Sequence, residues 1–569
     1  MTTRADPAIR RLQVTPSTPI SPANHIATAL RRQVPQAVAA EQAAGRAVTA
    51  LDLQSFYARS GDMPRWVDRD GRPSGSSAEA LSLLGSATAE GLDPADYSVP
   101  SLHRRFHALS NGQAPAPQEA AAFDVEISAA VLGYCRDLYG GRVDPHSIGF
   151  SVGQRRDARD FAAELDMALR SGVVSRLPQV LAPALRQYGF LKRALAIYRS
   201  LGEDDDIRAI GSMSRPIRPG AYSDQLPRLV RRLITLGDLR ADVRVEDPHV
   251  YDGALVTAVQ HFQHRHGLET DGIIGTATLA ALEVPPAARI RQIELAMERL
   301  RWLPDLGGER LIALNIPMYS LWTWDDSGAG AQALEMRAIV GRAARTQTPI
   351  LMAEMREVVF RPYWNVPPSI LRGELLPLLS RDPEYLSRHH YEVVRGDGDD
   401  AVAVELTPAS LGDLRAGRLR LRQRPGDWNA LGLAKFVFPN SANVYLHGTP
   451  TQGLFARARR DFSHGCVRVE DAAALAAWVL KDHSEWTRAR VDAAMAAPVS
   501  ESVRLSRPIR VVLFYLTALV DYDDGAIHFA DDIYGHDARL ERALAYRQLI
   551  AAGTRTLSMS PAPGDWHTY

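Results

Sequence analysis

The segment from Val444 to Asp471 reads VYLHGTPTQGLFARARRDFSHGCVRVED, and it indicates the chemistry of the domain around it. A short apolar stretch ends at His447, and a loop rich in Gly and Arg leads to Cys466. Asp471 suits the first turn of a helix predicted from the Ala and Leu residues that follow. Gly465 lets the backbone approach a bound carbonyl, and backbone N–H groups there can point at a developing oxyanion. Cys466 is therefore well placed to act as a nucleophile.

A thiol becomes a strong nucleophile only when it ionises, and a neighbouring imidazole and cations lower its pKa. His464 lies two residues before Cys466, and the same segment contains Arg457, Arg459, Arg460 and Arg468. We therefore expect an activated cysteine. The alternative is a buried structural cysteine in a glycine turn, and an isolated cysteine would favour it.

The HGTP…SHGCVR pattern resembles the L,D-transpeptidase catalytic domain of the YkuD type. Further segments extend the resemblance: Asn315–Pro317, Val340–Arg342, Thr348–Pro349, Pro362–Ile370, Tyr515–Ala518 and Asp532–Gly535. With the helical regions that precede this domain, the chain resembles the large YcbB-type members over about residues 50 to 540. The resemblance implies an enzyme that acts on peptidoglycan.

Roles for individual residues follow from the resemblance. Cys466 is the expected nucleophile, and His447 the expected general base, oriented by a backbone carbonyl such as that of Gly448. Ser463, His464 and Gly465 would shape the turn, and the amides of Gly465 and Cys466 would form the oxyanion hole. The predicted substrate-binding residues are Arg468, Tyr445, Trp364 and Arg460. A guanidinium suits the task of holding a substrate carboxylate.

The resemblance also implies the reaction. The thiolate would attack the carbonyl at the L-centre of diaminopimelate in a tetrapeptide stem and release D-Ala. An amine of a second stem would then resolve the thioester and cross-link two third-position residues, as in peptidoglycan biosynthesis and cell wall biogenesis. Two alternatives remain: a carboxypeptidase or endopeptidase of the same fold, and a wall-binding scaffold without activity. A papain-like protease fits poorly, because its cysteine would precede its histidine.

The 569 residues predict several domains of a multidomain α+β protein. We expect a flexible segment over 1–47, a helical scaffold over 48–215, a peptidoglycan-binding-like module over 216–287, a mostly β catalytic domain over 288–530 and a helical tail over 531–569. A long insert of helical character, 369–424, resembles the family's capping subdomain. It is long enough to act as a lid or subdomain.

The module between residues 216 and 287 has the helical periodicity of a three-helix bundle. The stretch AVQHFQHRHGLETDGIIGTATLAAL, Ala258 to Leu282, resembles the peptidoglycan-binding module. His261, His264 and His266 have a spacing that makes a metal site conceivable. We favour solvent-facing polar side chains there and predict no metal.

Lys+Arg and Asp+Glu each total 66, so the formal net charge is zero, which argues against a protein held to nucleic acid by bulk charge. Two cysteines exclude a disulfide-rich scaffold, and Cys135 is expected to be buried and inert. The longest apolar run, Val511 to Val520, is too short to span a bilayer.

The expected mechanism requires no cofactor. The expected partners are peptidoglycan stems as donor and acceptor, carbapenem-type inhibitors and other cell-wall enzymes. The substrate implies a periplasmic location, although the sequence shows no export segment.

Overall fold

The computed structural model describes residues 22–551 except 112, 153–158, 202–214, 244, 246, 327–331, 380, 383, 397 and 399–400. The chain divides into two compact units. The first comprises Met1–Thr88, Asp93–Arg136 and Ala158–Leu181, and the second comprises Ala89–Leu92, Asp137–Asp157 and Ala182–Tyr569.

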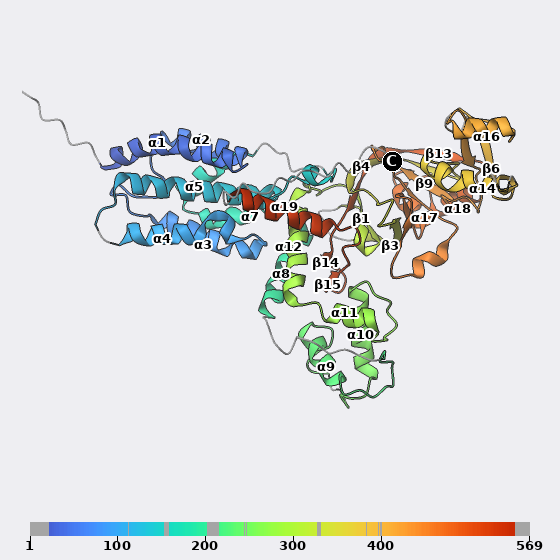
Figure 1. The fold of residues 1–569 in the computed structure, drawn as a ribbon, viewed down its shortest axis with the longest axis horizontal. Coiled ribbons are helices and arrows are strands. Elements are labelled where there is room, and N and C mark those ends of the chain that lie inside the picture. Colours follow the sequence, from blue (N-terminus) through green and yellow to red (C-terminus); the bar gives the residue numbers. More distant parts are fainter. Residues whose placement is uncertain are drawn as a thin grey trace, which may run out of the picture. The chain divides into compact units, whose positions relative to one another are not determined.

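The first unit is helical (Figure 1), and its long helices are α1 (Pro22–Ala43), α2 (Ala47–Ser60), α3 (Gly75–Gly85), α4 (Val99–Ser110), most of α5 (Pro117–Gly140) and α6 (Phe161–Ser171). One face of α5 has apolar residues at three- and four-residue spacing, and each is at most 1% exposed: Phe123, Ile127, Val131, Tyr134 and Leu138. At the centre, Tyr57 donates a hydrogen bond of 2.6 Å to Asp124. Burial raises the pKa of this carboxyl to about 6.

The expectation of a flexible segment over residues 1–47 is wrong for its second part. Helix α1 occupies Pro22–Ala43 and packs against α2. Ile26, Leu30 and Val34 recur every four residues and are buried, so the helix has an apolar face despite a composition rich in Ala and Pro. Residues 1–21 lie outside the described part of the chain.

The second unit contains a compact helical module formed by α9 (Leu226–Thr235), α10 (Gly253–Arg265) and α11 (Thr276–Leu282). The apolar faces predicted for the first two helices meet in one core that includes Leu229, Leu233, Val259 and Phe262. The module contacts the hairpin of β14 (Ala518–Val520) and β15 (Ile527–Phe529), where the buried Arg265 donates to the carbonyl of Ile527.

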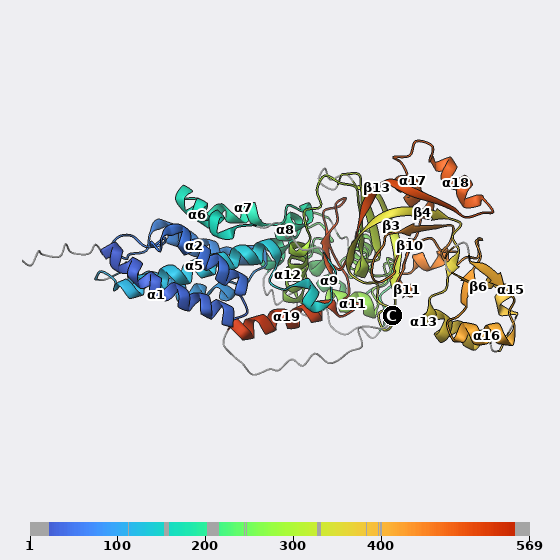
Figure 2. The same cartoon turned by 90° about the horizontal axis from the view of Figure 1, so that it is seen from above.

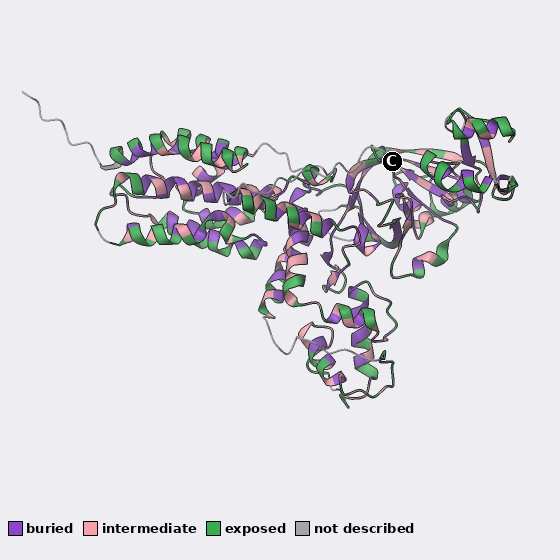
Figure 3. Cartoon of the chain, viewed as in Figure 1, coloured by how far each residue is buried: buried purple, intermediate pink, exposed green. Residues whose placement is uncertain are grey.

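The second unit also contains a nine-stranded sheet with the order β11-β3-β12-β10-β9-β4-β13-β1-β2. The strands are β1 (Leu311–Asn315), β2 (Ser320–Trp324), β3 (Gln332–Gly341), β4 (Leu351–Phe360), β9 (Ala434–Val437), β10 (Leu446–His447), β11 (Asp461–Ser463), β12 (Val467–Val469) and β13 (Glu501–Phe514). Strand β2 also pairs with β3, so the sheet closes on itself, and we call it the barrel. Buried residues are concentrated on these strands (Figure 3). The predicted β-rich domain is confirmed.

Helices accompany the sheet. The predicted helix after Asp471 is α17 (Ala472–Val479), and the Asp471 carboxylate caps it by accepting the N–H of Ala474. It is followed by α18 (Arg488–Ala496), and α12 (Pro286–Trp302) leads into β1 after packing against α8 (Arg186–Ser200). The C-terminal helix α19 (His536–Ala551) contacts α12, and residues 552–569 lie outside the described part.

The insert between residues 369 and 424 forms a lobe with its own apolar core (Figure 2). It was expected to be helical, but it mixes helices with strands. Its elements, with one strand at its root, are β5 (Trp364–Asn365), α13 (Pro368–Ile370), a π-helical turn (Leu371–Leu375), α14 (Leu376–Leu379), α15 (Tyr385–Arg388), β6 (Tyr391–Arg395), β7 (Val402–Val404), α16 (Pro408–Arg415) and β8 (Arg420–Gln423). Strand pairing buries Val393 and Leu421 in that core, which local helical propensity does not reveal.

Candidate active site

Strand register brings the predicted catalytic residues to one face of the sheet. The parallel strands β10 and β12 align Leu446 with Val467 and His447 with Arg468. Leu446 and Val467 are fully buried on one side. Because side chains alternate along a strand, His447 and Arg468 project from the other side, together with residues one position before each strand start, Tyr445 and Cys466. We call Tyr445, His447, Cys466, Arg468 and Lys435 the catalytic face, since Lys435 of β9 is the other register partner of His447.

The imidazole of His447 is held in one orientation. Its Nδ1 lies 2.6 Å from the carbonyl oxygen of Gly448, as the sequence predicted, and this geometry requires a proton on Nδ1. The side chain is 5% exposed. Burial lowers the pKa of His447 to about 3, with a further contribution from the positive charge of Arg468. The ring is therefore neutral at physiological pH, with Nε2 left as the basic atom.

The environment of Cys466 differs from the one we expected from the sequence. Burial raises the pKa of the thiol, although the backbone N–H and the hydroxyl of Tyr445 and the charges of Lys435 and Arg468 act in the opposite direction. Of the four arginines that the sequence suggested, Arg468 acts on the thiol, together with Lys435, which the sequence did not suggest. The loop with Arg457, Arg459 and Arg460 leads into β11. This strand lies on the other side of β3 from β12, so proximity in sequence was misleading for these arginines.

Tyr445 connects the thiol to the root of the insert. Its hydroxyl interacts with the side chains of both Cys466 and Trp364. Burial raises the pKa of Tyr445 well above its ordinary value, so the phenol stays protonated. Trp364 of β5 in turn lies 6.2 Å, between ring centroids, from Tyr391 in the insert core. The structure thus brings Tyr445 to the thiol and Trp364 to the hydroxyl of Tyr445, and both are predicted substrate-binding residues.

The turn from Ser463 to Cys466 is fixed by its own side chain. The hydroxyl of Ser463 donates to the carbonyl of Cys466 at 2.5 Å and accepts the N–H of Gly465 at 3.2 Å. Gly465 has φ +110°, a conformation that favours glycine. Because the N–H of Gly465 is engaged with Ser463, the predicted oxyanion hole depends chiefly on the amide of Cys466.

Residues behind the Ser463–Cys466 turn support it through hydrogen bonds, and the sequence analysis assigned no role to them. Thr348 donates to the carbonyl of Gly465 at 2.8 Å and accepts the N–H of Gly341. The hydroxyl of Tyr534 donates to the carbonyl of Gly341 at 2.6 Å and accepts the N–H of Thr348. These three residues lie in segments that carried the resemblance, and that was the only signal for them in the sequence.

Arg468 is a half-buried guanidinium beside the thiol. Its Nε is buried, and among the described residues it has no hydrogen-bond partner. Burial and the charge of Arg342 lower the pKa of Arg468, whereas Cys466 raises it, and no carboxylate contributes. An unpaired cation in this position suits an anionic group of a ligand.

His464 leaves the turn in another direction. Its Nε2 lies 2.6 Å from Oε1 of Glu374, in the π-helical turn of the insert, and 3.4 Å from a guanidinium nitrogen of Arg342. Glu374 was not identified from the sequence, because its contact with the turn arises only through the folding of the insert.

Arg460 is not brought to the catalytic face. It donates to the carbonyls of Tyr319, Ala338 and Arg457 and lines a cavity of about 500 Å³ beside the helical module. Its bonds stabilise the backbone before β11. The prediction that Arg460 binds the substrate at the thiol therefore finds no support in its position.

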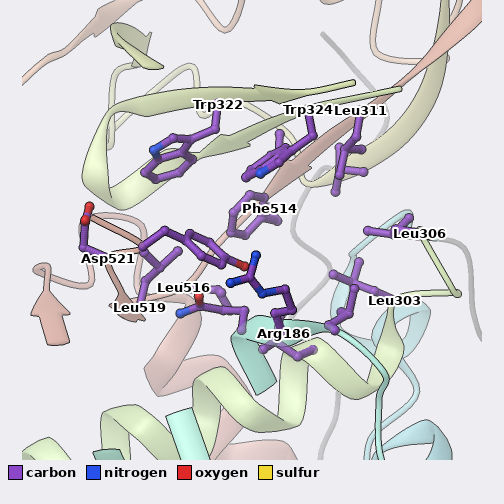
Figure 4. Close-up of a pocket in the computed structure, with 16 residues that line it drawn as sticks. Arg186, Leu303, Leu306, Leu311, Trp322, Trp324, Phe514, Leu516, Leu519 and Asp521 are labelled. Carbon is purple, nitrogen blue, oxygen red and sulfur yellow. The ribbon is translucent and has the colours of Figure 1, made fainter. Parts of the chain in front are cut away.

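Another cavity, of about 100 Å³ and mostly apolar, lies between the barrel and α8 (Figure 4). Trp322, Trp324 and Phe514 point into it, with Arg186 at its edge. It contains none of the predicted site residues.

Among the described residues, no group of three or more His, Cys, Asp or Glu side chains has metal-binding geometry. His261 instead pairs with Asp238, and the buried His266 stacks on Phe262.

Comparison with protein families matches three parts of the chain. Residues 51–195 match a scaffold domain, residues 223–282 match a "Putative peptidoglycan binding domain", and residues 309–499 match the YkuD L,D-transpeptidase catalytic domain. The last match contains the whole catalytic face.

One curated protein agrees with the family match. A curated protein of Haemophilus influenzae, named "Putative L,D-transpeptidase", is 35% identical over 253 residues, which cover 44% of this chain and 49% of that protein. The chain thus spans about half the length of this relative. A solved L,D-transpeptidase of Xylanimonas cellulosilytica aligns at 16% identity with a TM-score of 0.17, covering 53% of this chain and 100% of that one. The chain therefore contains a YkuD-type L,D-transpeptidase catalytic domain, preceded by a scaffold domain and a peptidoglycan-binding domain.

Proposed function

We propose that this protein is an L,D-transpeptidase that cross-links third-position diaminopimelate residues of peptidoglycan stems through a thioester on Cys466. The observation that carries the proposal is the catalytic face: Cys466, His447 and Arg468 project from adjacent parallel strands within the matched domain. A nucleophile, a base and an anion-binding group in this arrangement suit acyl transfer from a peptide.

Before acylation, the side chains of Cys466 and His447 are both uncharged. The pKa of Cys466 is raised by burial and that of His447 is lowered to about 3, so at neutral pH the thiol keeps its proton and the imidazole carries only the Nδ1 proton. Nε2 of His447 accepts the thiol proton as sulfur attacks the donor carbonyl. The same proton then passes to the amine of the departing D-Ala, and a thioester remains.

Stabilisation of the reaction comes from fixed groups. The amide of Cys466 faces the developing oxyanion, and the hydroxyl of Tyr445 stabilises negative charge on sulfur. Arg468 holds a carboxylate of the donor stem by charge and hydrogen bonding. The insert, anchored beside the thiol through Trp364 and Tyr445, limits the access of water to the thioester.

Mass spectrometry of the products formed from purified disaccharide-tetrapeptide tests the proposal. Loss of D-Ala together with dimer formation is the expected result. Loss of D-Ala without dimer would assign a carboxypeptidase instead. Unchanged substrate would contradict catalysis and favour a wall-binding scaffold.

Location, inhibitors and partners follow from this activity. No helix in the described parts of the chain has both the length and the hydropathy to cross a membrane. The peptidoglycan-directed domains support an extracytoplasmic location, which we propose to be the periplasm. Carbapenems, which present a strained carbonyl, should acylate Cys466, and other cell-wall enzymes are candidate partners.

A further inference from the structure

The catalytic face carries positive charges that suit the donor of the proposed reaction but repel its acceptor. Lys435 and Arg468 both favour the charged form of Cys466, and Arg342 acts on Arg468 from the neighbouring loop. Three cations suit the carboxylates of a donor stem. The acceptor, however, arrives with an amine that is an ammonium ion at neutral pH, and this face repels it.

Glu374 supplies the opposite charge at this position. Its carboxylate contacts the Ser463–Cys466 turn through His464, at 2.6 Å. Its side chain is 50% exposed and that of His464 is 27% exposed, so both are accessible to a ligand. Glu374 belongs to the insert, whereas the cations belong to the barrel and its β3–β4 loop. The insert thus presents a carboxylate at the turn that carries the nucleophile, where Nε2 of His464 also lies 3.4 Å from a guanidinium nitrogen of Arg342.

We propose that Glu374, with His464, is the acceptor site: it binds the ammonium group of the second stem beside the thioester. This inference rests on the proposed function and makes Glu374 a determinant of whether an amine or water resolves the thioester. An ammonium held by a carboxylate also occupies the place that a water molecule would take.

The step balances as follows. The acceptor ammonium, held by Glu374, gives one proton to solvent. The free amine attacks the thioester carbonyl, so a C–N bond forms and the C–S bond breaks. The second nitrogen proton passes to Nε2 of His447 and then to the departing sulfur, which restores the neutral thiol.

The experiment measures how the acyl-enzyme partitions. Purified full-length protein is incubated with disaccharide-tetrapeptide, and mass spectrometry gives the ratio of dimer to hydrolysed tripeptide. A parallel incubation adds hydroxylamine, an amine that is largely uncharged at pH 8, and gives the ratio of hydroxamate to tripeptide. In Glu374→Gln we expect the dimer ratio to fall about three- to tenfold, the range for loss of one partly exposed charge contact. The hydroxamate ratio should fall much less.

Two further variants separate charge from fold. Glu374→Asp keeps the charge on a shorter side chain and should retain more of the dimer ratio than Glu374→Gln. Glu384→Gln removes an 84% exposed carboxylate of the same insert and should behave as wild type. An equal fall of both ratios in Glu374→Gln, or no fall in either, would overturn the acceptor-site assignment while dimer formation by the wild type upholds the proposed function. A wild-type protein that forms hydroxamate but no dimer would overturn the transpeptidase proposal itself, and the acceptor site with it.

Discussion

His447 and Arg468 are register partners on the adjacent parallel strands β10 and β12. This pairing places a positive charge beside the proposed base, which is one reason why the imidazole stays unprotonated. It also places the anion-binding guanidinium on the same side of the sheet as the thiol. This register relationship therefore contributes to the protonation state of His447 and places Arg468 where the proposed donor carboxylate would bind.

The thiol of Cys466 is predicted to be the nucleophile. Cys466→Ala should release no D-Ala and form no carbapenem adduct, while the melting temperature stays within a few degrees because one small atom is lost. Cys135→Ala is the matched control: Cys135 is 2% exposed on α5, and this variant should still form the adduct. Peptide mapping of the adduct checks both, and an adduct on Cys135 would contradict the assignment.

The acylation rate should be nearly independent of pH across neutrality. The pKa of His447 is lowered to about 3, so the base is neutral above this value, and the raised pKa of Cys466 keeps the thiol protonated through the same range. The rate should fall only on acidification toward pH ~3, as Nε2 takes up a proton. Stopped-flow acylation by a carbapenem between about pH 4 and 8 tests this. An inflection near pH ~6.5, the ordinary histidine value, would indicate a solvated base instead.

The hydroxyl of Tyr445 is predicted to stabilise the thiolate as it forms. Tyr445→Phe should raise the pKa of Cys466 and slow acylation on the order of tenfold, since a hydrogen bond to a charged group contributes about 1.5–3 kcal/mol. The pH dependence of alkylation by iodoacetamide measures the shift. Tyr546→Phe, at a 39% exposed position on α19, provides the control. An unchanged alkylation profile in Tyr445→Phe would remove this role.

Arg468 is predicted to hold a donor carboxylate. Arg468→Gln should lower kcat/KM for the tetrapeptide on the order of 100-fold, the usual effect of truncating one partner of a partly buried charge pair. Arg468→Lys should recover only part of it, because the ammonium lacks the planar fork. Arg507→Gln, at a side chain that is 79% exposed, should have no effect. Equal kcat/KM in Arg468→Gln and wild type would argue that the guanidinium serves the fold alone.

The support behind the turn is predicted to tolerate no side chain at Gly341. A Cβ there would collide with the carbonyl oxygen of Thr346 and lie 2.7 Å from the backbone nitrogen of Thr348. Gly341→Ala should therefore displace Thr348 from Gly465 and lower both the melting temperature and the acylation rate. Gly453→Ala, where no atom lies within 4 Å of an added Cβ, is the control. Thermal melts and carbapenem acylation of the two variants give the comparison.

Local patterns in the sequence were sufficient for much of the fold. Helical periodicity predicted the three-helix module, and the mostly β domain expected over residues 288–530 contains the nine strands of the sheet. The same kind of reasoning missed α1, whose apolar face is sparse, and the strands of the insert, which are stabilised by pairing between distant segments. Both errors have one cause: the stabilising contacts lie outside the segment itself.

The sequence alone was sufficient to propose which residues carry the chemistry, because the HGTP and SHGC motifs carry the resemblance that implies their roles. It also indicated that a backbone carbonyl would orient His447, a contact between neighbours in the chain. Only the tertiary structure decided the electrostatics. Burial raises the pKa of Cys466, strand register brings Lys435 and Arg468 to the thiol and takes Arg460 away, and the folded insert brings Glu374 to His464. Desolvation and the approach of distant charges depend on what surrounds a residue in space, which its neighbours in sequence do not specify.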